Sequence, residues 1–147
     1  MTVDFLMQTI VAGIMASYVL LTLAMWSYRI GLPRLDFASA MVSLTYGPSF
    51  EGKEQPYWAG MLVVYFNGVF FTLLYATFVS QYLPGIPLMK GAIWGVTLWF
   101  ISGIFFIPVF SREGFFLSHI HPMAWLANLI AHGGFGLVVG WLAPITN

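Results

Sequence analysis

Four apolar stretches without a charged side chain dominate this sequence, and each is long enough to cross a membrane. A transmembrane helix needs about 20 mostly apolar residues, because the hydrocarbon core of a bilayer is about 30 Å thick. No water reaches the backbone at that depth, so each stretch should form a helix that satisfies its own N–H and C=O groups. The sequence therefore predicts an all-α membrane protein whose four transmembrane helices form an antiparallel bundle. The predicted helices cover residues 5–28, 58–82, 91–110 and 122–143, within one domain over residues 1–147.

The composition supports lipid as the main solvent of this chain. Only 7% of its residues are charged and 60% are hydrophobic, whereas a soluble domain carries about 25% charged residues. The absence of cysteine excludes disulfides, thiolate metal sites and covalent haem attachment through paired thiols. The formal net charge is zero and no basic cluster occurs, so we expect no nucleic acid partner.

The long connection between the first two predicted helices contains a further helical pattern. Its stretch "LDFASAMVSL" places Leu35, Phe37, Met41 and Leu44 on one side of a helix, and Asp36 can cap the N-terminus. We expect a short helix that lies in the membrane interface. An exposed loop, "YGPSFEGKEQP", should follow it. The alternative is an irregular loop with a few buried anchors.

Packing between the spans should rely on small residues, because lipid provides no hydrophobic drive for helix association. The short connection "LPGIPLMK" ends the second helix and should make the second and third helices antiparallel neighbours. Glycines at about one-turn spacing in the third and fourth helices suit close contact within the bundle or with a neighbouring subunit. These are Gly91, Gly95, Gly133, Gly136 and Gly140.

Lysine and arginine residues near the helix ends predict the orientation, because cytoplasmic loops carry an excess of these residues. The side of the membrane that holds the long connection has four of them and the opposite side has only Lys90. We therefore expect a protein of the bacterial cytoplasmic membrane with both termini on the non-cytoplasmic side. The four residues are Arg29, Arg34, Lys53 and Arg112.

All three histidines lie in one stretch, "SHIHPMAWLANLIAH". His121 and His132 stand eleven residues apart, about 16 Å along a helix at 1.5 Å per residue, so they cannot share a metal ion. His119 and His121, with Glu113 as the nearest acid, make only a weak metal loop. We expect no metal site in this chain.

His132 is the predicted helical residue best suited to ligate a cofactor. A haem or pigment that needs a single protein ligand would use it, whereas two axial imidazoles are excluded because the other predicted spans contain no histidine. The competing interpretation is that His132, with Asn128 one turn earlier, bonds across the bundle to Asn67 or to a backbone carbonyl. We expect no cofactor held by this chain alone, and a haem, pigment or quinone only if it is shared with partners.

A quinone or lipid-headgroup site is the remaining candidate. Arg112, His119 and His121 gather at one predicted membrane face, beside Phe115 and Phe116. The same composition describes an ordinary membrane-surface loop, and both interpretations stay open. No carboxylate lies within a predicted span, so we expect neither proton pumping nor catalysis from the isolated chain.

Three segments resemble small four-helix bacterial integral membrane proteins of unassigned function. They are "GLPRLDFASAM", "LPGIPLMKGAIWG" and "LIAHGGFGLVVGWL". The resemblance implies a four-helix bundle and supplies no catalytic residues.

The sequence as a whole favours a non-catalytic integral accessory subunit of a larger membrane complex. A respiratory or photosynthetic electron-transfer complex is the kind of assembly that we expect. The chain would brace neighbouring helices and lipids, with membrane lipids and other integral subunits as its partners. Two alternatives stay open: a small homo-oligomeric channel or transporter, and a membrane protein that binds haem or pigment through a single ligand.

Overall fold

Helices build the described part of this protein. The computed structural model describes residues 2–46 and 57–145, and no β-strand occurs within them. Four helical segments there are long and apolar enough to cross a membrane. The prediction of an all-α chain with four helices of spanning length is thereby confirmed, and it is consistent with an integral membrane protein. The four segments are Val3–Ile30, Tyr57–Val79, Pro87–Ser111 and Ala124–Leu142.

Most spans join an α-helix to a short 3₁₀- or π-helix, whose turns are narrower or wider than those of an α-helix. The elements in chain order are α1 (Val3–Trp26), the 3₁₀-helix η1 (Ser27–Ile30), α2 (Phe37–Tyr46), α3 (Tyr57–Leu74), the π-helix η3 (Tyr75–Val79), α4 (Pro87–Ile101), the π-helix η4 (Ser102–Ser111), the 3₁₀-helix η5 (Phe115–Leu117) and α5 (Ala124–Leu142). The third span begins earlier than predicted because Pro87 occupies the first turn of α4, where its missing N–H costs no hydrogen bond. Pro108 lies inside η4, whose wider turns suit a residue that cannot donate a backbone hydrogen bond.

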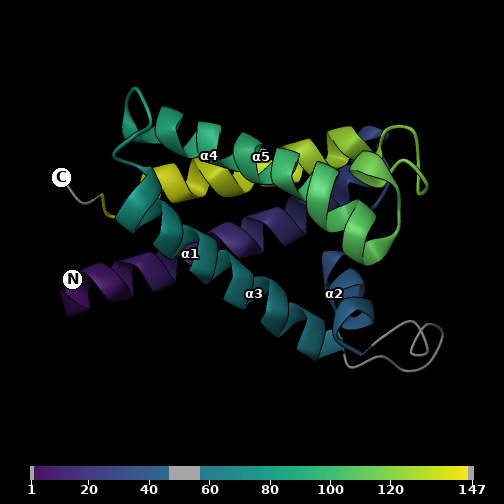
Figure 1. Cartoon of the computed structure of the whole chain (residues 1–147), viewed down its shortest axis with the longest axis horizontal. Coiled ribbons are helices and arrows are strands. Elements are labelled where there is room, and N and C mark those ends of the chain that lie inside the picture. Colours follow the sequence, from purple (N-terminus) through teal and green to yellow (C-terminus); the bar gives the residue numbers. More distant parts are fainter. Residues whose placement is uncertain (1, 47–56, 146–147) are drawn as a thin grey trace.

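Helix α5 is the centre of the arrangement, since it packs on both α1 and α4, and α1 packs in turn on α3. The two termini lie at the same end of the molecule (Figure 1). The expectation that the helices flanking the short connection pack side by side along their length is wrong. They meet near the connection, where the rings of Tyr75 in η3 and Trp94 in α4 have centroids 6.2 Å apart, and the backbones of α3 and α4 diverge from there (Figure 1). The reason is that α4 is held by α5, whereas α3 is held by α1 and α2.

Glycines bring the backbones of α4 and α5 into direct contact. Gly91 and Gly95 of α4 face Gly136 and Gly140 of α5. A Cβ atom added to Gly136 would lie 2.7 Å from the Gly95 Cα and would meet the Gly91 carbonyl oxygen. Gly133 is different, because an added Cβ there would have no neighbouring atom within 4 Å.

Glycines also bring the backbones of α1 and α3 into close contact, and one hydroxyl group takes part in this contact. A Cβ atom added to Gly13 would lie 2.6 Å from the Cα of Val69. A Cβ atom added to Gly68 would meet the hydroxyl of Ser17, which donates to the Gly13 carbonyl at 2.8 Å. The hydroxyl is therefore satisfied within α1 and leaves room only for a glycine opposite it.

Helix α2 exists, but it presents a different face from the predicted one. The buried residues Ala38 and Val42 face Gly60 of α3, where an added Cβ would meet the Ala38 carbonyl. Leu35 is buried as well, yet it precedes the helix and donates its N–H to the Ala24 carbonyl at 3.0 Å. The residues closest to α3 differ from the predicted ones because α3 offers a glycine, so the smaller residues of α2 fit closest, while Leu35 and Phe37 of the predicted side pack in the core with α5. Among the remaining predictions, the side chain of Leu44 and the loop over residues 47–56, with Lys53, lie outside the described residues.

Asp36 caps α2 as predicted. Its Oδ1 accepts the backbone N–H of Ser39 at 3.1 Å, and its Oδ2 accepts the Ser39 hydroxyl at 3.0 Å.

Replacing Asp36 with alanine should loosen α2 without unfolding the spans, because an N-cap is worth about 0.5–2 kcal/mol. The measurement is hydrogen–deuterium exchange over residues 37–46 in detergent, where we expect faster exchange. Asp36→Asn is the matched control, since an asparagine oxygen can still cap the helix. Equal exchange in Asp36→Ala and the wild type would show that packing on α3 alone holds α2.

Candidate functional site

The loop between η4 and α5 contains three residues in an uncommon backbone conformation. Arg112, Phe116 and Leu117 have φ values of 58°, 52° and 64°. Non-glycine residues rarely adopt this left-handed region, and each such residue costs about 1–3 kcal/mol unless its surroundings impose it. Strain of this kind clusters at functional sites. The loop is therefore the first place to look for one.

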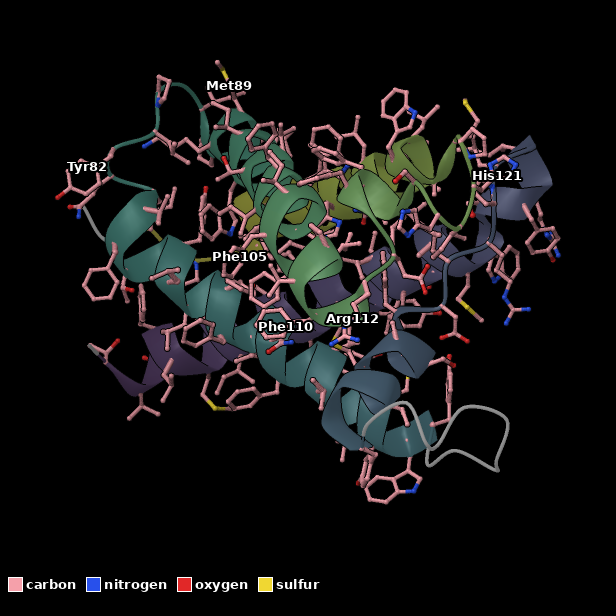
Figure 2. The ribbon with its side chains drawn as sticks, turned by 45° about the vertical axis from the view of Figure 1, so that its right-hand side comes forward. Tyr82, Met89, Phe105, Phe110, Arg112 and His121 are labelled. Carbon is pink, nitrogen blue, oxygen red and sulfur yellow. The ribbon has the colours of Figure 1, made fainter. Side chains whose placement is uncertain are left out.

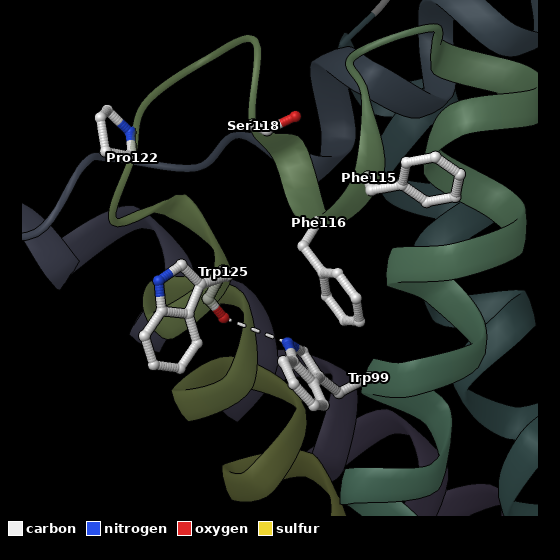
Figure 3. Close-up of a pocket in the computed structure, with 6 residues that line it drawn as sticks. All are labelled: Trp99, Phe115, Phe116, Ser118, Pro122 and Trp125. Carbon is white, nitrogen blue, oxygen red and sulfur yellow. Dashed lines mark hydrogen bonds between the residues drawn. The ribbon is translucent and has the colours of Figure 1, made fainter.

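The surroundings that impose this conformation centre on the Phe116 ring. This ring lies over Gly103, where an added Cβ would be 2.8 Å from the Phe116 Cγ and closer to two other ring atoms. The ring also packs on Trp99, with centroids 4.7 Å apart and planes 39° apart. Trp99 donates its indole N–H to the Trp125 carbonyl at 3.1 Å (Figure 3). The end of α4, the loop and the start of α5 are thus joined through two aromatic side chains.

A pocket of about 240 Å³ lies at this junction (Figure 3). Figure 3 shows the Trp125 ring on one side of it and the Trp99 and Phe116 rings on the other. The lining is mostly apolar, with one hydroxyl group. The lining residues are Trp99, Phe115, Phe116, Ser118, Pro122 and Trp125.

The residues predicted for a quinone or lipid-headgroup site are exposed and lie in the same loop, but they do not line this pocket. The Nδ1 of His119 hydrogen-bonds to the Arg112 carbonyl at 3.2 Å. The Nδ1 of His121 accepts the backbone N–H of Met123 at 3.0 Å, one residue before α5 begins. Figure 2 shows Arg112 and His121 well apart. Contact of these side chains with a ligand stays a prediction. Among the described residues, no three histidine or acidic side chains lie close enough to hold a metal ion.

His132 interacts with its own helix and with α2. It is half-buried, and its Nδ1 hydrogen-bonds to the Asn128 carbonyl at 3.0 Å. Its ring meets the Phe37 ring edge-on, with centroids 6.0 Å apart. The bond across the bundle to Asn67 does not form, because α3 does not pack on α5. Ligation of a haem or pigment by His132 stays a prediction.

Polar groups in the spans are mostly turned inward. The Asn128 side chain is fully buried, and neither of its amide atoms has a hydrogen-bond partner among the described residues. The same holds for the Tyr75 hydroxyl and the Trp94 indole N–H. Most hydroxyl groups donate to the carbonyl four residues earlier in their own helix, as those of Thr9, Ser17, Thr72, Thr77 and Thr97 do.

Asn67 differs from these inward-facing polar groups, because its side chain is only half-buried and lies midway along the second span. The side-chain amide of Asn67 hydrogen-bonds to no residue that the structure describes. Gly60 and Phe71 share its helix face at spacings of seven and four residues. Gly60 is covered by α2, and Phe71 packs on the core that includes Trp94. Asn67 lies between these two covered positions.

Neither a protein-family model nor a curated protein nor a solved structure matches this chain. Function therefore has to be argued from the geometry itself. The unpaired Asn67 on α3 and the aromatic pocket beside α5 are the two features that a partner or a ligand could reach from outside the buried core. They lie on different elements, so each supports its own argument.

Proposed function

We propose that this chain is a non-catalytic integral subunit of a larger membrane assembly, where it braces neighbouring helices and lipids. In that setting the four spans would form an antiparallel bundle with α2 lying in the interface. A bacterial cytoplasmic membrane, with both termini on its non-cytoplasmic side, agrees with the distribution of lysine and arginine. The observation that carries the proposal is the unpaired amide of Asn67.

A side-chain amide in the hydrocarbon region loses the hydrogen bonds that water would supply, and this loss is costly. Asparagine side chains in membranes accordingly hydrogen-bond between helices. The amide of Asn67 offers donors and an acceptor that the described part of the chain leaves unused. The face of α3 that adjoins Asn67 is strongly apolar, since Phe66 is 72% exposed and Phe70 is 52% exposed. This face of α3 suits a helix of another subunit.

A respiratory or photosynthetic electron-transfer complex is the assembly that we propose for this subunit. Such complexes use lipid-soluble ring compounds as carriers. The aromatic pocket between α4 and α5 opens at the end of two spans, where the head of such a carrier lies. The proposal of an electron-transfer complex rests on the pocket and does not depend on the argument from Asn67.

The homo-oligomeric channel has less support from the geometry. A pore between copies of this chain needs polar side chains on an outer helix face. Several serine and threonine hydroxyl groups of the described spans instead bond to their own backbones, and large apolar side chains cover the outside. Binding of haem or pigment through His132 would need its Nε2, because its Nδ1 is bonded to α5.

Photo-crosslinking in native membranes tests the proposed function. A benzophenone side chain at position 66 should form an adduct with one other membrane protein, whereas the same group at Trp141, 77% exposed on α5, should not form that adduct. Asn67→Leu should weaken the association about three- to thirty-fold, as expected for one interhelical hydrogen bond. Val63→Leu, one turn earlier on α3, is the matched control and should have no effect. Purification as a uniform homo-oligomer, with adducts only between copies, would contradict the proposal and favour the channel.

A further inference from the structure

We propose that the pocket beside α5 binds the planar ring of a lipid-soluble, quinone-class compound. The pocket is defined by the aromatic side chains of Trp99, Phe116 and Trp125 together with the Ser118 hydroxyl. The inference concerns binding by this chain alone and does not depend on the partner subunit proposed for α3.

The walls of the pocket are already in place without a ligand. Trp99 is fixed by its hydrogen bond to the Trp125 carbonyl and by its contact with the Phe116 ring. Phe116 is held over Gly103 by a backbone conformation that costs energy to maintain. A preorganised site loses little entropy on binding, so even a small ring can gain affinity here.

The shape of the pocket selects a flat group. Trp125 faces the Trp99 and Phe116 rings across it (Figure 3), and aromatic rings prefer offset-stacked or edge-to-face neighbours. A quaternary ammonium group would need several free ring faces around it, but Trp99 and Phe116 pack against each other at 4.7 Å. A planar, uncharged ring fits this arrangement better than a lipid cation does.

The Ser118 hydroxyl supplies the polar contact that a quinone needs. It is exposed, hydrogen-bonds to no residue that the structure describes and points away from the Trp125 and Trp99 rings (Figure 3), so rotation about the Cα–Cβ bond is needed to direct it at a bound ring. A hydroxyl donates readily to a carbonyl oxygen, and the two ring carbonyls are the polar atoms of a quinone. Since the Trp99 N–H is already used by Trp125, the side-chain donors on the pocket lining that remain available are the Ser118 hydroxyl and the Trp125 indole N–H.

The size of the pocket limits it to the head of the ligand. A cavity of about 240 Å³ is smaller than the roughly 300–1,000 Å³ of sites that enclose a drug-sized molecule. A long apolar tail would stay in the bilayer, beside exposed side chains such as Phe115. The site is therefore suited to a compound that reaches it sideways from the membrane.

The test uses the full chain in lipid nanodiscs and 2,3-dimethyl-1,4-naphthoquinone as the probe, with equilibrium dialysis as the measurement. We expect saturable binding of one probe per chain. Phe116→Ala should weaken it at least about tenfold because one wall is lost, and Ser118→Ala about three- to tenfold because one hydrogen bond is lost. Trp141→Ala removes an exposed ring far along α5 and should leave binding unchanged.

Two results would overturn the inference. Uptake that rises linearly with probe concentration, and equally in the wild type and Ser118→Ala, would show partition into lipid only. Equal displacement of the probe by a short-chain phosphocholine lipid or by a ringless alkyl ketone would show that the pocket does not select a planar ring. Ser118→Ala keeps the test valid if Phe116→Ala fails to fold, because Ser118 is exposed and bonded to no described side chain.

Discussion

Gly136→Ala should destabilise the protein by an amount at the upper end of the about 1–3 kcal/mol that overpacking costs. The new methyl group would lie 2.7 Å from the Gly95 Cα and would meet the Gly91 carbonyl oxygen. Both obstacles are backbone atoms, so neither can turn away as a flexible side chain would. The only relief is a separation of α4 from α5, which loosens the contact along its whole length. Thermal unfolding in mild detergent, followed by size-exclusion chromatography, measures this loss.

Gly133→Ala is the matched control in the same helix. Its methyl group would have no neighbouring atom within 4 Å, and alanine favours a helix over glycine by up to about 1 kcal/mol. We therefore expect unchanged or slightly raised stability. Equal destabilisation by the two substitutions would mean that α4 and α5 do not touch through their glycines.

Gly68→Ala should produce the second large loss, about 1–3 kcal/mol, by separating α3 from α1. Its methyl group would meet the Ser17 hydroxyl and lie 3.2 Å from the Ser17 Cβ. The nearest obstacle is one removable side chain, although the Gly13 carbonyl oxygen also lies 3.2 Å away, so most of the loss should be reversible. Ser17→Gly in the same chain removes both contacts and should restore much of the stability.

The double-mutant cycle of these two substitutions gives the decisive measurement. Ser17→Gly alone should also destabilise, because it places a glycine in α1 and removes the hydrogen bond to the Gly13 carbonyl. The double variant should nevertheless be more stable than the sum of the two single effects, by about 0.5–3 kcal/mol of coupling. Strict additivity would show that positions 17 and 68 are not in contact.

The number and approximate limits of the spans could be predicted from the sequence because uncharged runs of spanning length admit few other structures. The role of Asp36 as an N-cap could also be predicted, since it directly precedes a helical pattern. The helices on which each helix packs could not be predicted in this way. The two prolines near residue 85 suggested that the flanking helices pair, but glycine contacts with α1 and α5 decide the pairing, and these involve residues more than 40 positions away.

The candidate site was predicted in part for a similar reason. The stretch rich in histidine directed attention to the loop before α5, where Phe115 and Phe116 lie, and a site in this loop stays a prediction. The place of Trp99 in the pocket could not be predicted, because nothing in its local sequence indicates that Gly103 leaves room beside it for Phe116. A glycine one turn after a tryptophan is the only local sign. The unpaired state of Asn67 also depended on which helices meet.

The central position of α5 has a consequence for biogenesis. Its partner α1 is the first of the described helices to leave the ribosome, while α5 is the last of them. Until then α1 and α4 expose to lipid the faces that pack on α5, and the face of α4 carries Gly91 and Gly95. Assembly of this protein should therefore be a late event after translation of the other spans, and a chain stalled before residue 124 should be an early substrate for membrane quality-control proteases.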